Sequence, residues 1–313
     1  MAGGTDQGVH VDLPSLVHLR AHATGFSFLP RQPVHSLLAG RHASRLRGRG
    51  LSFEELRRYV PGDDVRTIDW KVTARTRKPH VRVFTEERDR PVLLVVDQRR
   101  SMFFGSRRAM KSVAAAELAA LAAWRALAGG DRIGALVFDD RDVVAIPARR
   151  SQQQVLQILH AIVQKNRALR TDLSLHPDPA ILDRVLNAAL RIAKHDQLVC
   201  LIGDGAGTGP HTVEQVTRLS QHNDVLFAFV FDPLEANLPE VGTLVMAADE
   251  LQLEVDTSSR RLTRNFADDF TERLTTLRRL SRERAMPFLP ISTEGDVAGQ
   301  IRSLLGRHTG RAA

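Results

Sequence analysis

The stretch PVLLVVD at residues 91–97 decides the fold class of this chain, because a short apolar run ends abruptly on an aspartate. A run this short and this apolar is typical of a strand that is buried on both faces of a sheet. Further short apolar runs follow at 132–138, 142–146, 197–204, 224–231 and 288–292. Amphipathic helical patterns separate most of them. Strands that alternate with helices in this way predict a mostly parallel sheet with helices on both faces.

Capping residues set the expected boundaries of the helices. We expect a helix over 107–128, with Ser106 as its N-cap and Gly129 as its stop. Ser151 and Gln154 have the spacing of a capping box, which predicts a second helix after residue 151. The remaining expected elements are helices from residue 178, from Thr212 to about 221, over 262–285 and after Asp296, and a hairpin over 242–256.

Length and composition exclude several classes of protein. The 313 residues predict about two domains of roughly 150 residues each. Hydrophobic residues make up 43% of the chain and charged residues 26%, which excludes a disordered or collagen-like protein. Cys200 is the only cysteine, so an intramolecular disulfide or a multi-cysteine zinc site is excluded, and a reducing compartment is favoured.

Membrane and export signals are not visible in the sequence. The most apolar stretch, 109–128, carries Lys111, Glu117 and Arg125, which argues against a membrane-spanning helix. The first residues lack the basic and apolar blocks of a secretory signal. We therefore expect no membrane segment and a cytoplasmic location.

Positive charge is concentrated in the first part of the chain. The net charge is +8, and residues 1–90 hold 16 Lys and Arg against 10 Asp and Glu. Residues 31–50 contain five arginines and no acid, which indicates either an anionic partner or a solvated segment. Aromatic residues are only 5%, which argues against a stacking platform for single-stranded nucleic acid.

The change in composition near Pro91 suggests how the chain is organised. We expect residues 1–34 to be an N-terminal extension, with disorder as one alternative. A smaller, irregular, basic region should cover 35–90. The α/β domain should cover 91–306, followed by a tail at 307–313.

Polar residues at two predicted strand ends mark the candidate site. Asp97 ends one buried strand, Asp204 ends another, and ligands of such sheets bind beyond the carboxyl ends of the strands. Ser101 follows Asp97 closely, and Thr171 lies between two predicted helices. Two carboxylates with two hydroxyls could hold a hard cation such as Mg²⁺.

This arrangement resembles the von Willebrand factor A domain and its metal-ion-dependent adhesion site. In that family a first loop reads Asp-x-Ser-x-Ser, a second supplies a Thr and a third an Asp. The resemblance implies a von Willebrand A-like, Rossmann-like fold. It also implies that Asp97 and Ser101 are first-loop ligands, with Thr171 and Asp204 from the other loops. The departure is Arg99, which stands where the family has its first Ser.

The charge of Arg99 bears directly on metal binding. A guanidinium about 4 Å from a divalent cation is repelled by roughly 8 kcal/mol at an effective dielectric constant near 20. The whole binding free energy of a micromolar site is about 8 kcal/mol. If Arg99 points into the site, we expect no metal, and the guanidinium should pair with Asp97 and Asp204. If it points outward, weak Mg²⁺ binding remains an alternative. A third alternative is that these residues serve only as caps and turns.

A second motif, RYVPGDDVRTIDW, occupies residues 58–70. Pro61 and Gly62 predict a tight turn, and the alternating acids and bases can form an ion-pair network around Trp70 as an apolar anchor. The alternative is that the carboxylates do acid–base or metal chemistry. The acids are Asp63, Asp64 and Asp69, and the interleaved bases are Arg58, Arg66, Lys71 and Arg75.

This motif resembles the signature of a bacterial family, the domain of unknown function family 58. With the von Willebrand A-like half, the resemblance covers about residues 35–306. It implies no catalytic activity. It implies a partner, because such proteins are encoded beside MoxR-type AAA+ ATPases and are thought to help mature other proteins. The matching residues are Tyr59, Pro61, Gly62, Asp63, Asp64, Arg66, Ile68, Asp69, Trp70, Ala74, Arg75, Glu87 and Arg88.

The leading hypothesis is a non-enzymatic binding module for a MoxR-type AAA+ ATPase and a client protein. We expect the partner to contact Arg99, Ser101 and Met102, with Arg99 receiving a partner carboxylate as a bidentate pair. One alternative is nucleic-acid binding through the basic segment 41–58. Another is an enzyme that uses the carboxylates of 63–69 or the glycine-rich loop 203–209, which lacks the ending of a P-loop.

Overall fold

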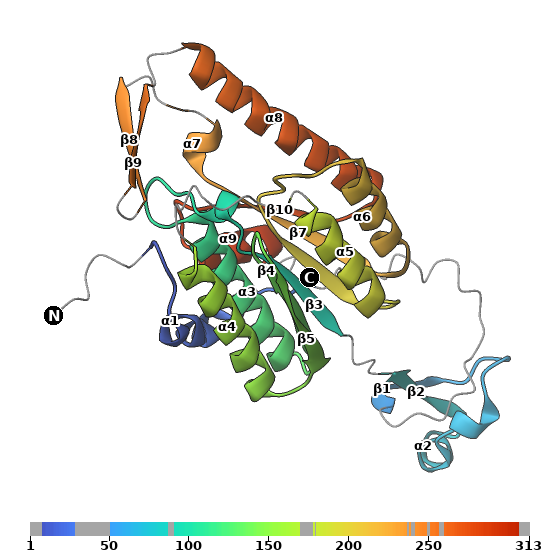
Figure 1. Ribbon diagram of the computed structural model, residues 1–313. Coiled ribbons are helices and arrows are strands. Elements are labelled where there is room, and N and C mark those ends of the chain that lie inside the picture. The colour runs from blue at the N-terminus through green and yellow to red at the C-terminus, as the bar shows by residue number, and fades with distance from the viewer. Residues whose placement is uncertain are drawn as a thin grey trace. The chain divides into compact units, whose positions relative to one another are not determined.

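A computed structural model describes most of the chain, and Figure 1 shows its elements. The chain divides into two compact units. The large unit consists of residues 1–30 and 90–313, and the small unit of residues 31–89. The small unit is thus inserted in the sequence between two segments of the large one. The described residues are 8–28, 51–86, 91–169, 178, 180–236, 238, 242–248, 251–256 and 260–306.

A six-stranded sheet forms the centre of the large unit, and its strand order is β10-β7-β6-β3-β4-β5. All neighbouring pairs are parallel except β4 and β5, which are antiparallel. The predicted fold class is therefore confirmed: a mostly parallel, Rossmann-like α/β sheet. The strands are β3 (Val92–Asp97), β4 (Ile133–Phe138), β5 (Val143–Arg149), β6 (Leu198–Gly203), β7 (Asp224–Phe231) and β10 (Phe288–Ser292).

Both faces of this sheet are covered, because every residue of β3, β4 and β6 is buried. Successive side chains of a strand point to opposite faces. Leu94 and Val96 accordingly pack into the core on one face, and Leu93 and Val95 into the core on the other. The first core contains residues of α3 (Lys111–Ala128), α4 (Gln152–Arg167) and α9 (Val297–Leu305), and the second contains residues of α5 (Ile181–Ile192), α6 (Pro210–His222) and α8 (Arg260–Glu283).

Three of the predicted capping residues are confirmed as helix caps, and two predicted helix starts are wrong. Ser151 accepts a hydrogen bond from the Gln154 N–H, Gly129 ends α3, and Asp296 caps α9. The side chain of Gln154 donates to the Pro147 carbonyl at 2.6 Å, so only the N-cap half of the expected capping box forms. α3 begins at Lys111 and not at residue 107, because the Ser106 hydroxyl donates to Asp232 instead of capping a helix. α6 begins at Pro210, with Gly209 as N-cap and Thr212 in the first turn.

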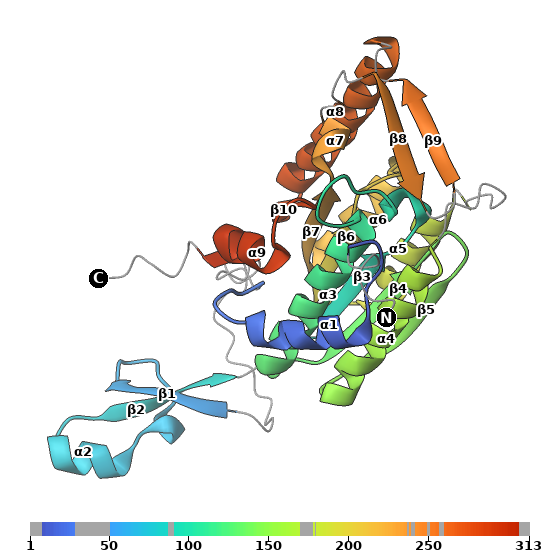
Figure 2. The same ribbon diagram turned by 90° about the vertical axis from the view of Figure 1, so that its left-hand side faces the viewer.

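Residues 8–28 belong to the large unit, although we expected an extension there. The short helix α1 (Leu13–His18) and the 3-10 helix η1 (Leu19–His22) lie beside α3 and α4 in both views (Figures 1 and 2). Leu16, Phe26 and Phe28 are buried in the core. The indole Nε1 of Trp124 donates to the Leu16 carbonyl oxygen at 3.1 Å. Burial of these few apolar side chains fixes a segment that has no strong helical pattern of its own.

The small unit is an antiparallel hairpin of β1 (Leu51–Arg58) and β2 (His80–Glu86) with two short helices between its strands. These are the 3-10 helix η2 (Val65–Thr67) and α2 (Trp70–Thr76). Asp69 caps α2 by accepting hydrogen bonds from two backbone N–H groups.

The expected hairpin over 242–256 is confirmed as β8 (Thr243–Ala248) and β9 (Leu251–Asp256), and it follows the short helix α7 (Pro233–Ala236). In the part of the chain that the structure describes, no helix combines the length and the apolar character that a bilayer crossing requires.

Candidate functional site: a charged network at the strand ends

The two predicted carboxylates meet at the carboxyl ends of neighbouring strands. Asp97 ends β3, Asp204 follows β6, and β3 and β6 pair directly in the sheet. Both side chains are buried. Gly203 makes this close approach achievable, since a Cβ atom at that position would lie 2.9 Å from the Cβ of Asp97. The sequence therefore located this pair correctly.

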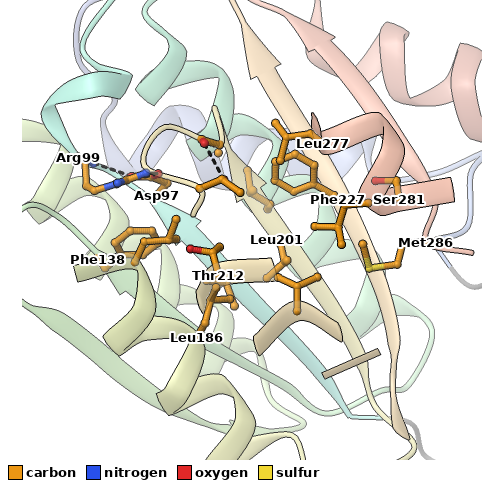
Figure 3. Close-up of a pocket in the computed structure, with 18 residues that line it drawn as sticks. Asp97, Arg99, Phe138, Leu186, Leu201, Thr212, Phe227, Leu277, Ser281 and Met286 are labelled. Carbon is orange, nitrogen blue, oxygen red and sulfur yellow. Dashed lines mark hydrogen bonds and ion pairs between the residues drawn. The ribbon is translucent and has the colours of Figure 1, made fainter. Parts of the chain in front are cut away.

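Arg99 points into the site and lies between the two carboxylates. Its Nε is 3.0 Å from each carboxylate oxygen of Asp97, and its Nη2 is 2.6 Å from Asp97 Oδ2. The same Nη2 lies 3.9 Å from Asp204 Oδ1 and donates to the Ala206 carbonyl at 3.0 Å. Arg99 is only 8% exposed, and Figure 3 shows it paired with Asp97 above Phe138.

A second cation, Lys111, neutralises the other side of Asp204. Its Nζ is 3.0 Å from Asp204 Oδ2 and 2.8 Å from Glu235 Oε1. Arg273 Nη2 approaches the same Glu235 oxygen at 2.9 Å. Lys111 is only 2% exposed. We call these six side chains the strand-end network: the carboxylates of Asp97, Asp204 and Glu235, and the cations of Arg99, Lys111 and Arg273.

Burial and mutual attraction set the pKa values in the strand-end network. Burial opposes the charge of Lys111, but Asp204 and Glu235 outweigh it, and the pKa of Lys111 is raised. Burial likewise opposes the charge of Asp204, but Lys111 and Arg99 outweigh it, and the pKa of Asp204 is lowered. Burial raises the pKa of Asp97 against the opposing charge of Arg99. Arg99 donates its backbone N–H and its guanidinium N–H groups to Asp97, which fits the carboxylate form of Asp97.

These residues do not fit a Mg²⁺ ion. Magnesium needs near-octahedral oxygen ligands, whereas a guanidinium and an ammonium group already contact the two carboxylates that would ligate it. Ser101 is exposed on the surface. Within the described residues, no group of three or more His, Cys, Asp or Glu side chains is arranged to hold a metal. Thr171, the ligand expected from the second loop, lies outside the described residues.

Hydrogen bonds hold the neighbouring strand-end loops in fixed positions. Asp232, after β7, accepts hydrogen bonds from the Ser106 hydroxyl at 2.7 Å and the Thr293 hydroxyl at 2.5 Å. Asp140, after β4, accepts a hydrogen bond from the backbone N–H of Arg100 at 2.6 Å. Met102, which we expected at the partner surface, is fully buried because the 3-10 helix η3 (Arg100–Met102) turns its side chain into the core.

In the small unit two of the signature acids pair with arginines whose side chains stay largely exposed, although Asp69 itself is buried. Asp63 contacts Arg57 at 2.7 Å, and Asp69 contacts Arg82 at 2.8 Å. The hydrogen bond from Arg57 lowers the pKa of Asp63, and the cap bond from the Val72 N–H is the main reason that the pKa of Asp69 is lowered.

Other parts of the signature have local roles. Asp64 accepts a hydrogen bond from the Arg66 N–H at 2.9 Å, and Gly62 adopts a positive φ of 107°. The Tyr59 N–H donates to the Pro79 carbonyl at 2.9 Å, and Arg75 is exposed. Trp70, expected as an apolar anchor, is 70% exposed. The five arginines of residues 31–50 lie outside the described residues, and so do Glu87 and Arg88.

Comparisons with known proteins agree with the motif. The family described as "Protein of unknown function DUF58" matches residues 55–276, so the chain belongs to this family. The chain is 29% identical to the uncharacterized protein Mb1516 of Mycobacterium bovis and to the uncharacterized protein Rv1480 of Mycobacterium tuberculosis. Each alignment covers 90% of this chain and 88% of the relative.

One similar solved structure is the conserved hypothetical protein BatB from Bacteroides thetaiotaomicron. Its TM-score is 0.39 and its sequence identity is 15%, over 67% of this chain and 93% of that chain.

Sequence reasoning missed half of the strand-end network. Lys111 lies in an alanine-rich helix where a charge suggests a solvent-facing position, and Glu235 and Arg273 lie far along the chain. A signal was available, because the residues three, four and seven positions after Lys111 are Ala114, Ala115 and Leu118, so the lysine begins an apolar face of the helix.

Proposed function

We propose that this protein is a non-enzymatic adaptor that works with a MoxR-type AAA+ ATPase in the maturation of client proteins. Its partner binds the surface at the carboxyl ends of β3, β4 and β6. The family membership supports the choice of partner through the resemblance described above. The geometry of the strand-end network supports the choice of surface.

The position of the Arg99 guanidinium carries this proposal. In related folds a metal ion organises the strand-end loops, and here a side-chain cation does so through Asp97 and the Ala206 carbonyl. Because three carboxylates and three cations neutralise one another, the surface needs no external ion to hold its shape. A general acid or base has to reach a substrate proton, and the three carboxylates of the network are buried and engaged with its cations.

The contact with the partner then falls on residues around the network. The Nε–Nη2 edge of Arg99 is occupied by Asp97, so this edge does not receive a partner carboxylate. Arg99 acts as a positioning residue. The exposed Ser101 and the loop after β6 form the contact surface.

A pull-down from native lysate tests the adaptor role. The full chain should retain a MoxR-type ATPase equally well with and without a chelator of divalent cations. Arg99→Ser should reduce retention of the ATPase at least several-fold. Added Mg²⁺ should not restore retention in this variant, and it should not change retention by the wild-type chain. Arg149→Ser is the matched control. Arg149 is exposed, and its backbone lies opposite Ile133 at the start of β4, whereas the proposed surface lies at the carboxyl end of that strand. Retention that chelator abolishes, or that Arg99→Ser leaves unchanged, overturns the proposal.

A further inference from the structure

A cavity of about 60 Å³ lies beside the strand-end network, between the sheet and helices α5, α6 and α8 (Figure 3). Open α/β sheets bind their ligands at this end of the strands. Asp97, Arg99 and Phe138 lie at one side of the cavity in this view, and Ser281 and Met286 at the other. The apolar wall includes Leu186, Leu201, Val216, Phe227, Leu277 and Met286.

One polar group in this apolar wall has no partner. Ser281, on α8, is 3% exposed, and its hydroxyl makes no hydrogen bond with any described residue. A serine inside a helix usually bonds the carbonyl oxygen one turn earlier or points to solvent, and Ser281 does neither. Because buried polar groups are nearly always hydrogen-bonded, the free hydroxyl indicates a group that enters the cavity. A hydroxyl can donate to a carbonyl or accept from an N–H, so a peptide group would satisfy it.

The charges at the other side of the cavity argue against an anionic ligand. Arg99 is the only cation of the described lining, and its charge is balanced by Asp97 at 2.6 Å. The charges of Asp204 and Asp140 also act on Arg99. A ligand carboxylate would meet these acids as well as the guanidinium. The cavity therefore favours an uncharged group.

The size of the cavity limits what it can hold. A single water-sized probe occupies about 10–15 Å³, so a cavity of about 60 Å³ has room for at least roughly four to six water-sized units. A leucine side chain is close to this size. Long acyl chains are larger.

We propose that this cavity binds one uncharged apolar side chain of leucine size, presented in a peptide segment whose backbone bonds the Ser281 hydroxyl. This proposal rests on the proposed function, because the partner protein supplies the peptide segment. The cavity would let the protein select partner segments that carry such an apolar side chain. The charged network beside it cannot make this selection, because its charges are already neutralised.

N-acetyl-L-leucinamide is the probe for this cavity, and the full chain with labelled methionine methyl groups is the sample. The probe should shift the Met286 methyl resonance saturably and leave that of Met102 in place, because Met286 lines the cavity and Met102 does not. N-acetyl-L-leucine, which carries a carboxylate, should bind several-fold more weakly. N-acetylglycinamide, which lacks the side chain, should cause no saturable shift.

Two serine variants separate binding from stability. Ser281→Ala should weaken binding of the leucinamide about 3- to 10-fold, the range expected for one net hydrogen bond. Ser112→Ala is the matched control, since Ser112 is also a buried, unpartnered serine in a helix but lies outside the lining. Absence of a saturable Met286 shift overturns the proposal, as does equal binding of N-acetylglycinamide or an equal loss in both variants. Such a result leaves the pull-down above unaffected, so the two proposals fail separately.

Discussion

The large and small units both place acids beside bases, yet they use them in opposite ways. In the strand-end network, Lys111 and Asp204 are almost completely buried and lie 3.0 Å apart. In the small unit, the side chain of Arg57 is 42% exposed in its pair with Asp63, at a similar distance of 2.7 Å. Distance alone therefore does not distinguish the two pairs. Burial distinguishes them, because water and salt screen the charges of the exposed pair. The charges of the buried pair are compensated by neighbouring protein groups and not by solvent.

This contrast implies that the strand-end network is required for the stability of the large unit, whereas the exposed pair of the small unit is not required for stability. A buried ion loses several kcal/mol of solvation, so each member of the strand-end network depends on the others for compensation. An exposed pair can lose a partner to water at little cost. The two units should accordingly respond differently to the same substitutions.

Removal of Lys111 should have the largest effect. Lys111→Met leaves Asp204 without its closest cation in a buried site, and we expect a loss of about 3–5 kcal/mol in the free energy of unfolding. Lys71→Met, at an exposed position of the small unit, is the control and should change little. Urea denaturation of the full chain measures both. A loss below about 1 kcal/mol for Lys111→Met would remove the distinction between the networks.

The two tryptophans extend the comparison to apolar side chains. Trp124 is 2% exposed and bonds the Leu16 carbonyl, so Trp124→Ala should lower the free energy of unfolding by about 3–5 kcal/mol. Trp70→Ala should stay within about 0.5 kcal/mol, because that side chain faces solvent. Thermal and urea unfolding measure the difference, and equal losses would show that Trp70 is covered in solution.

Acid should weaken the strand-end network through Asp204. Its pKa in the folded protein is lowered from the ordinary value of 3.8, so it stabilises the fold above that pH. This stabilisation is lost as the pH falls from about 3.8 through the lower folded pKa. Asp97, whose pKa is raised by burial, contributes with the opposite sign.

Asp204→Asn should therefore flatten the dependence of the unfolding free energy on pH below about pH 4. Asp269→Asn, at an exposed position on α8, is the control. Urea unfolding across the acid range tests the difference. Parallel curves for wild type and Asp204→Asn would contradict the lowered pKa.

The smallest expected effect belongs to the exposed pair of the small unit. Asp63→Asn should cause a slight loss of stability at low ionic strength, because the solvent-exposed ion pair between Arg57 and Asp63 is lost. The difference from wild type should vanish in about 1 M salt, where the Debye length is about 3 Å. Lys111→Met should keep its effect in the same buffer, since the buried site excludes the salt. A salt-independent loss for Asp63→Asn would mean that this pair is protected.

The sequence predicted what depends on local pattern and missed what depends on distant packing. Asp97 and Asp204 could be placed because each ends an apolar run, and parallel strands end at one edge. Lys111 was missed, because its helix was expected to start earlier and its charge suggested a solvent-facing position. Trp70 was expected to be an anchor from its residue type, yet the short helix α2 leaves it exposed. Glu235 and Arg273 join the site only through the positions of α7 and α8.

The placement of residues 8–28 has a consequence for biosynthesis. The backbone N–H of Val11 bonds the Asn166 side chain across 155 positions, and the Leu16 carbonyl meets its indole partner across 108. At about 5–20 residues per second, a ribosome needs roughly 5 to 30 s to deliver these partners. During that interval the first segment has no place to dock, and the inserted hairpin unit is synthesised after this segment but before residues 90–313 of the large unit.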